Sequence, residues 1–259
     1  MLPLIAMICV DSITKRYAGV PAVEDVSFKV EPGEIVGFLG PNGAGKSTVL
    51  KMLSTWLPPS SGKASICGHD VTREPLEARS SLGYLPEHNA LYDDMRVGKF
   101  LAFMGRARGL SGSQLKERLD WSIGATHLAD VIGLRIHQCS KGYRQRIGLA
   151  ASLIHDPRVI LLDEPTHGLD PLQVVAFRDF LRELSEGRAV LFSSHVLSEV
   201  AAICERVLIL GHGRLLANQS IADLKARAES EDRDLESVVL SIVDGTGGRS
   251  DALRGGKRD

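Results

Sequence analysis

The stretch GPNGAGKST, from Gly40 to Thr48, matches the phosphate-loop pattern GxxxxGK(S/T) in full. It follows the apolar run EIVGFLG (Glu34–Gly40), which predicts a buried strand, and it opens a helix predicted over Lys46–Leu57, before Pro58. A strand, a glycine-rich loop and a helix in this order are the structural context that a phosphate loop requires. The stretch therefore predicts an α/β fold with a nucleotide site at this loop.

Each part of the stretch is expected to contact a different part of the nucleotide. The glycines let backbone N–H groups converge on the β-phosphate, and the following helix adds the positive end of its dipole. Lys46 is expected to reach the β- and γ-phosphates, and the Ser47 hydroxyl to bind Mg²⁺. The predicted nucleotide-binding residues of the stretch are Gly40, Asn42, Gly43, Gly45, Lys46, Ser47 and Thr48.

The composition is that of an ordinary globular chain. Its 259 residues include 31 Lys and Arg against 32 Asp and Glu, so we expect no nucleic-acid partner, which would need a basic surface. The four cysteines show no CxxC spacing, which predicts neither a zinc site nor a disulfide framework and fits a reducing cytoplasm. Residues 1–6 are apolar but lack a basic flank, so we expect no signal peptide.

A second apolar run, Val159–Leu162, leads into the acidic pair Asp163 and Glu164. The run predicts a parallel strand buried on both faces, and parallel sheets bind ligands at the carboxyl ends of their strands. Asp163 is expected to hold the Mg²⁺ shell, and Glu164 to act as general base on the attacking water. An isolated acidic pair could equally be a solvated turn. The phosphate loop elsewhere in the chain favours the catalytic interpretation.

Two further side chains are candidates for the same site. His195 follows the apolar strand AVLFSS, one strand along the chain from the acidic pair. We predict a catalytic neutral imidazole that donates to the γ-phosphate; the alternative is a structural histidine or a helix cap. Tyr17 could stack on adenine, or it could simply pack in a β-hairpin.

The segment CSKGYRQR, from Cys139 to Arg146, predicts a second anion site. Ser140 is a good N-cap, and Gly142 permits close approach of the backbone. The helix predicted over Tyr143–His155 adds the positive end of its dipole. Because this turn ends a helical part of the chain away from Lys46, we expect it to bind the γ-phosphate held by another subunit.

The rest of the pattern predicts how the chain is divided. Alternating polar and apolar residues over Ile8–Val36 predict an antiparallel β layer, and amphipathic stretches predict a helical subdomain inserted over about 95–155. We expect a main domain over 7–218, a short C-terminal helical extension over 219–244 and a disordered tail over 245–259.

Taken in order, these motifs resemble those of the ATP-binding subunits of ABC transporters. The segments that carry the resemblance are Tyr17, GPNGAGKST, GYLPE, CSKGYRQR, VILLDEP, HGLDP and SSHVLSEV. The resemblance implies a P-loop NTPase core of the RecA-like type with an antiparallel β subdomain and an inserted α-helical subdomain. It also implies an ATPase that closes head to tail with a second ATP-binding subunit, in a homodimer or a heterodimer. Ser140 and Gly142 would then face the partner's ATP, Asp170 would cross the interface, and a membrane permease would dock near Glu87.

The chain departs from the family pattern at three places. The usual LSGGQ reads CSKGY here, and His167 stands where serine is common. Glu87 replaces a glutamine that usually contacts Mg²⁺; a carboxylate could still face the metal, although it cannot donate as an amide does. GYLPE, SKGYRQR and the late LESVVLSIV are similar to the ABC-2 type exporters, a group that includes drug, antibiotic and polysaccharide exporters and gliding-motility auxiliaries.

The resemblance thus predicts an ATPase that uses ATP and Mg²⁺ to power an ABC-2 type exporter. Such a subunit would be cytoplasmic and peripheral on the inner face of the cell membrane. The alternative is a soluble ABC ATPase that acts as an assembly or scaffold factor. A regulatory module that binds ATP and scarcely hydrolyses it is disfavoured by Glu164 and His195.

Overall fold

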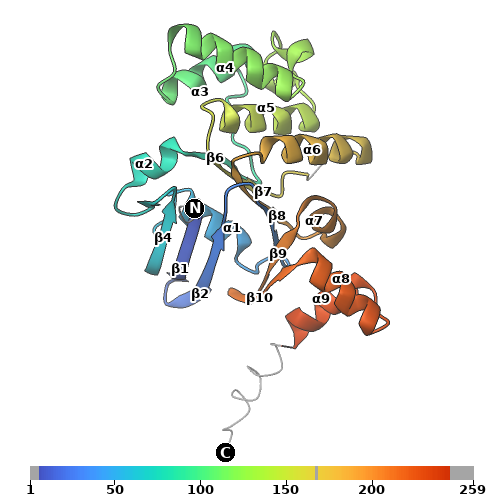
Figure 1. Ribbon diagram of the computed structural model, residues 1–259. Helices are drawn as coiled ribbons and strands as arrows, with labels where there is room; N and C mark the ends of the chain where they lie inside the picture. Colours follow the sequence, from blue (N-terminus) through green and yellow to red (C-terminus); the bar gives the residue numbers. More distant parts are fainter. Residues whose placement is uncertain (1–5, 167–168, 246–259) are drawn as a thin grey trace, which may run out of the picture.

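A computed structural model describes residues 6–166 and 169–245, which form two sheets and a set of helices (Figure 1). The tail predicted beyond Gly245 and the substituted His167 lie outside the described residues. No helix in these two ranges combines the length and the apolar character needed to cross a membrane.

The smaller sheet is the antiparallel layer that the alternating pattern predicts. Its strand order is β2-β1-β4-β5, and β1 pairs with β2 from Ile8 opposite Val30 to Tyr17 opposite Val20. The strands are β1 (Ile8–Tyr17), β2 (Val20–Val30), β4 (Ser61–Ile66) and β5 (His69–Asp70).

The larger sheet has the order β10-β9-β3-β8-β7-β6, and all its pairs are parallel except β9 with β10. Its strands are β3 (Ile35–Leu39), β6 (Leu82–Leu85), β7 (Val159–Asp163), β8 (Ala189–Ser194), β9 (Arg206–Gly211) and β10 (Arg214–Ser220). Every residue of β3, β7 and β8 is buried, as their continuous apolar runs predict.

The pairing in this sheet positions the functional residues. Strand β8 lies between β3 and β7, with Leu39 opposite Ser194 and Asp163 opposite Ser193. The carboxyl ends of the three strands therefore meet at one edge of the sheet. The phosphate loop, the acidic pair and His195 follow these ends in the sequence, so they are brought together there.

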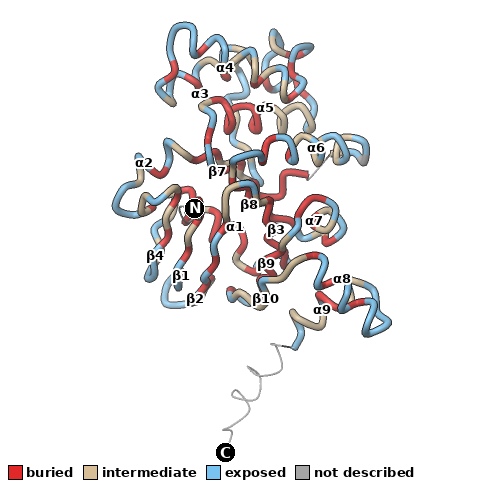
Figure 2. The backbone as a smooth tube through the Cα atoms, viewed as in Figure 1, coloured by how far each residue is buried: buried red, intermediate tan, exposed pale blue. Residues whose placement is uncertain are grey.

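Side chains of the central strands alternate between two apolar cores. Val36 and Phe38 pack with the antiparallel layer and with α1 (Lys46–Leu53), whereas Ile35 and Leu39 face the core under the later helices. The helices on that second face are α5 (Lys141–Leu153), α6 (Pro171–Leu184), α7 (Leu197–Ile203), α8 (Ile221–Ser230) and α9 (Leu235–Asp244). Figure 2 shows the buried backbone concentrated in the central strands.

A third core holds the helices that lie beyond the sheets in Figure 1. Its buried residues run from Val97 to Ile154. The elements that contribute to it are α3 (Val97–Ala107), α4 (Gly112–Ala125), two short 3₁₀ turns (Ala129–Val131 and Ile136–Gln138) and α5. We retain about 95–155 as the proposed limits of a helical subdomain, and 219–244, which contains α8 and α9, as the proposed C-terminal extension.

Three helix boundaries differ from the predictions for local reasons. Helix α5 ends at Leu153 rather than His155, shortly before Asp156 adopts a left-handed φ of 58°. Helix α1 ends at Leu53 rather than Leu57, because Thr55 adopts a left-handed φ of 63° that the helix cannot continue through. Helix α5 begins at Lys141 rather than Tyr143, because Ser140 is its N-cap and accepts a hydrogen bond from the Tyr143 N–H at 3.4 Å. The short helix α2 (Pro75–Ser80) was not predicted.

Gly37 of β3 gives a test of the packing between this sheet and α7. A methyl group at this position would collide with Val200 and lie 3.2 Å from the Cys204 sulfur. We expect Gly37→Ala to lower the free energy of unfolding by about 1–3 kcal/mol in urea titrations. Gly133→Ala is the matched control, because a Cβ there meets nothing within 4 Å. Equal stability of the two variants would contradict the packing of α7 against β3.

Candidate functional site

A cleft of about 410 Å³ lies over the phosphate loop at the carboxyl edge of the central sheet. It is lined by Ala22, Asn42, Gly43, Ala44, Gly45, Lys46, Ser47, Thr48, Glu87, Glu164 and His195. Segments that are more than 100 positions apart in the sequence thus share one cavity, as the strand order requires. A second cleft of about 600 Å³ lies between α4, α5 and α6, and none of the predicted site residues lines it.

The phosphate loop has a backbone that only glycine adopts readily. Gly43 and Gly45 have φ values of 82° and 103°, in the left-handed region. Gly45 is the N-cap of α1 and provides no side-chain cap, so the first turn of the helix keeps N–H groups available for an anion. A Cβ on Gly45 would lie 2.9 Å from the Ala22 carbonyl oxygen. The positive φ of Gly45 and the lack of space for a Cβ both explain why glycine is needed at this position.

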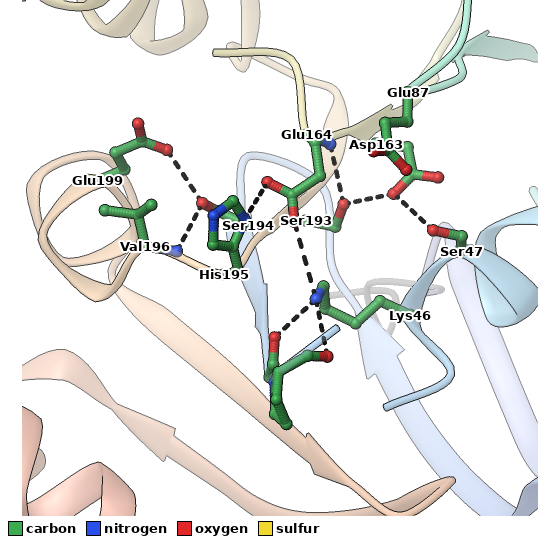
Figure 3. Close-up of polar contacts among 12 residues, drawn as sticks. Lys46, Ser47, Glu87, Asp163, Glu164, Ser193, Ser194, His195, Val196 and Glu199 are labelled. Carbon is green, nitrogen blue, oxygen red and sulfur yellow. Dashed lines mark hydrogen bonds and ion pairs between the residues drawn. The ribbon is translucent and has the colours of Figure 1, made fainter. Parts of the chain in front are cut away.

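Lys46 is held inside the cleft by groups that a phosphate could replace. Its side chain is only 6% exposed, and Nζ donates to the carbonyl oxygens of Gly40 at 2.6 Å and Pro41 at 3.3 Å. Nζ also lies 3.7 Å from Glu164 Oε1 (Figure 3). Burial lowers the pKa of Lys46, and the carboxylates of Glu164 and Asp163 oppose that effect.

Asp163 is a buried carboxylate that two serine hydroxyls stabilise. Its Oδ1 accepts hydrogen bonds from Ser47 Oγ at 3.1 Å and Ser193 Oγ at 2.7 Å (Figure 3). Burial raises the pKa of Asp163, the two hydroxyls oppose the rise, and the nearby Glu87 charge adds to it. A cation beside Asp163 and Glu87 would offset the cost of burying the Asp163 charge and would reduce the repulsion between the two carboxylates.

The oxygen groups here fit Mg²⁺. Magnesium prefers octahedral oxygen ligands at about 2.0–2.1 Å and usually takes one or two carboxylates with substrate phosphates. The 3.1 Å separation of Ser47 Oγ and Asp163 Oδ1 suits two neighbouring ligands of such an ion. The Tyr84 hydroxyl is buried and has no hydrogen-bond partner among the described residues, and its pKa is raised by burial and by the charges of Asp163 and Glu87.

No cluster of three or more His, Cys, Asp or Glu side chains within 6–166 and 169–245 could hold a metal alone. A bound Mg²⁺ would therefore depend on the Ser47 hydroxyl and on phosphate oxygens as well as on carboxylates.

Glu164 and His195 form a close pair at the same edge. His195 Nδ1 lies 2.9 Å from Glu164 Oε2 (Figure 3). An ionised carboxylate only accepts, so Nδ1 donates, and a neutral ring then presents a lone pair at Nε2. Donation to a phosphate, as predicted for a neutral His195, would require release of Glu164 or a doubly protonated ring.

Several predicted nucleotide-binding residues do not line the cleft. The Tyr17 ring is 49% exposed, with Lys15 Nζ 5.6 Å from its centroid. Asp170 is the N-cap of α6 and accepts from the Gln173 N–H at 2.9 Å, and a Cβ on Gly142 would lie 3.3 Å from Gln173 Oε1. The N-termini of α5 and α6 are therefore adjacent, and Ser140, Gly142 and Asp170 gather there, outside the cleft.

The sequence interpretation missed Ser193. Its hydroxyl donates to Asp163 and accepts from the Glu164 N–H at 3.0 Å, so it joins the ends of β8 and β7. The available signal was its place immediately before Ser194 and His195 at the end of a predicted strand. A serine in that position is indistinguishable from an ordinary strand residue until its neighbour in the sheet is known.

Comparisons with known proteins are consistent with this geometry. Residues 23–167 match the family model for the ABC transporter. The chain is 38% identical over 241 residues to the ABC transporter ATP-binding protein NatA of Bacillus subtilis (strain 168), which covers 91% of this chain and 97% of that protein. It is 37% identical over 229 residues to the daunorubicin resistance ATP-binding protein DrrA3 of Streptomyces coeruleorubidus, which covers 88% and 72%.

A solved structure of an ATP binding subunit of an ABC transporter superposes with a TM-score of 0.83 at 28% identity, over 91% of this chain and 99% of that chain. This likeness and the family match confirm the predicted fold class.

Lys46 gives a direct test of the cleft. We expect Lys46→Ala to weaken ATP binding by about 10- to 100-fold, because charge-assisted hydrogen bonds contribute about 1.5–3 kcal/mol. Isothermal titration with ATP measures the change, and turnover should fall as well. Lys51→Ala is the control, because Lys51 lies on the same helix with its Nζ 5.4 Å from the Trp56 ring. Unchanged ATP affinity in Lys46→Ala would rule out this cleft as the phosphate site.

Proposed function

The chain belongs to the ABC transporter family as an ATP-binding subunit that hydrolyses ATP, and we propose that it powers an ABC-2 type membrane exporter by ATP-driven head-to-tail pairing. The observation that carries this proposal is the division of the predicted nucleotide-binding residues into two groups. One group, the phosphate-loop residues from Asn42 to Thr48, lines the cleft, and the other, Ser140, Gly142 and Asp170, gathers outside it at the adjacent N-termini of α5 and α6; Tyr17 and Gly40 belong to neither group. Neither group is a complete ATP site by itself.

In this proposal, residues in and around the cleft have separate roles. Lys46 exchanges the Gly40 and Pro41 carbonyls for phosphate oxygens, and Tyr17 supplies a ring for adenine. Ser47, Asp163 and Glu87 would hold Mg²⁺, which would neutralise charge on the phosphates. The list of proposed phosphate-loop contacts is completed by Gly40, Asn42, Gly43, Gly45 and Thr48.

Glu164 acts as the base in this proposal. Its Oε2 is within hydrogen-bond distance of His195 Nδ1, and its Oε1 is near Lys46 Nζ. When phosphates engage Lys46 and His195, Glu164 is released from both and can accept a proton from the attacking water. His195 keeps Glu164 oriented in the absence of nucleotide and contacts the γ-phosphate in its presence.

The second group would complete the site of a neighbouring subunit. Ser140 has non-helical backbone angles as the N-cap of α5, and Gly142 follows in the first turn, so a phosphate can approach the helix N-terminus closely. Asp170 caps α6 beside this turn and would contact the partner across the interface. The partner is a second copy of this chain or a related ATP-binding subunit.

The exporter assignment rests on the relatives and on one surface. DrrA3 is called a daunorubicin resistance protein, which supports export of a drug-like substrate. Near the Glu87 loop, the exposed Tyr92 and Phe103 rings pack edge to face with centroids 5.8 Å apart. Exposed aromatic pairs of this kind suit a protein interface, and we assign this one to a membrane permease. The working subunit is then peripheral on the cytoplasmic face of the membrane.

Glu164→Gln tests the pairing step. The amide keeps the size of the side chain but cannot accept the proton, so we expect hydrolysis to fall by about 100-fold or more. ATP should then persist in the site, and the variant should elute as a dimer with ATP and as a monomer without it in size-exclusion chromatography. A variant that stays monomeric at saturating ATP would contradict the proposal.

Mixing two inactive variants tests whether Ser140 acts in trans. Lys46→Ala and Ser140→Arg should each fail to dimerise with ATP. Their heterodimer contains one composite site with an intact Lys46 and an intact Ser140, so the mixture should show ATP-driven dimers. No dimer in the mixture would place the Ser140 turn outside the nucleotide interface.

Affinity purification tests the exporter assignment. We expect this chain, purified from detergent-solubilised native membranes, to bring a multi-spanning membrane protein in stoichiometric amount, as identified by mass spectrometry. Phe103→Ser should reduce the yield of that protein, with Trp56→Ser, another exposed aromatic, as the control. Recovery of a stoichiometric soluble partner instead would favour an assembly or scaffold role.

A further inference from the structure

A carboxylate outside the nucleotide cleft joins the two segments that carry Glu164 and His195. Glu199 lies in the first turn of α7, and its Oε2 accepts a hydrogen bond from Ser194 Oγ at 2.9 Å (Figure 3). The same oxygen accepts a second hydrogen bond from Thr166 Oγ1 at 2.7 Å. Ser194 directly precedes His195, and Thr166 follows Glu164 by two residues. One carboxylate oxygen therefore connects both catalytic segments.

On the His195 side, the contact fixes the backbone on both sides of the histidine. The Ser194 hydroxyl donates to Glu199 and accepts from the Val196 N–H at 3.0 Å (Figure 3). This is a local turn in which a serine side chain bonds the N–H two residues ahead. Ser194 and Val196 flank His195. The Ser194 hydroxyl that bonds the Val196 N–H is itself bonded to Glu199, so both neighbours of His195 are held in place.

On the Glu164 side, a short loop is held at three points from three different elements. The Glu164 N–H donates to Ser193 Oγ of β8, and the Pro165 carbonyl accepts from Gln145 Nε2 of α5 at 3.1 Å. Thr166 completes the set through Glu199 of α7. Glu164 itself has a φ of 49°, a left-handed conformation that persists only where the surroundings enforce it.

From these contacts we propose that Glu199 is a positioning residue that keeps Glu164 and His195 in register for hydrolysis. This inference rests on the roles proposed above for Glu164 and His195. Because Ser194 and Thr166 are both buried, loss of the shared acceptor would leave two hydroxyl donors without a partner away from water. We expect each segment then to rearrange, so that Glu164 and His195 no longer approach the attacking water and the γ-phosphate from fixed backbone positions.

Both hydrogen bonds go to a single oxygen of Glu199, so two substitutions can separate its role as an acceptor from its charge. Glu199→Gln keeps a carbonyl oxygen that can accept from both hydroxyls, whereas Glu199→Ala removes it. A competing interpretation is that Glu199 acts by its negative charge at the N-terminus of α7. That interpretation predicts that Gln and Ala are equally defective.

The test is a comparison of kcat with ATP affinity in the full chain. We expect Glu199→Ala to lower kcat by about 10- to 100-fold, as small misplacements of catalytic groups do, with ATP affinity unchanged within about threefold. Glu199→Gln should restore kcat to within about threefold of the native chain. Glu205→Ala, which removes an exposed carboxylate just after α7, should leave both quantities unchanged. Equal kcat in the Ala and Gln variants, or a parallel loss of ATP affinity, would overturn the proposal.

Double variants separate this inference from the proposed function. If Glu199 acts through His195, Glu199→Ala should reduce kcat far less in a His195→Ala background than in the native chain. Additive losses would show that Glu199 does not act through His195 and would overturn the proposal that it holds both residues in register. If His195→Ala and Glu164→Gln each leave hydrolysis intact, the proposed catalytic roles fail first; if both variants are defective while Glu199→Ala is normal, only the inference about Glu199 fails.

Discussion

Parallel pairing of β8 with β3 on one side and β7 on the other is the constraint on which the rest of the site depends. Each strand delivers a different chemical group at its carboxyl end: the phosphate loop, the acidic pair and His195. The strands are buried on both faces, so a shift in their register would move apolar side chains between the two cores that cover the sheet. Core packing thus indirectly fixes distances within the cleft.

The charges at this edge are placed where burial disfavours them. Lys46, Asp163 and Glu164 are all nearly inaccessible to solvent, and the structure offsets the cost with loop carbonyls, serine hydroxyls and the Lys46–Glu164 contact. These are exchangeable partners. A polyphosphate and a divalent cation offer stronger ones to the same groups, so the arrangement is suited to a ligand whose binding rearranges its contacts.

Around the charges lies a scaffold of hydroxyl groups. Ser193 and Ser194 are consecutive in β8, and their hydroxyls hold Asp163 and Glu199 respectively. Successive strand residues point to opposite faces of the sheet. Ser193 and Ser194 therefore bond Asp163 and Glu199 on opposite sides of it. The helical part of the chain joins the same scaffold through Gln145 and Pro165, so a movement of α5 would reach the loop that carries Glu164.

The sequence by itself determined the α/β fold class and the presence of a nucleotide site, because the motifs that indicate them are local. The phosphate loop needs glycines at 43 and 45 with positive φ, the apolar runs before Asp163 and His195 must be buried strands, and Ser140 is a local helix cap. Tertiary structure alone decided which groups face one another. The bond from Ser193 to Asp163, the shared acceptor at Glu199 and the left-handed φ of Glu164 depend on strand order and on contacts across about 30 positions. The sequence around a hydroxyl or a carboxylate does not indicate its hydrogen-bond partner, because the packing of the whole sheet determines which groups meet.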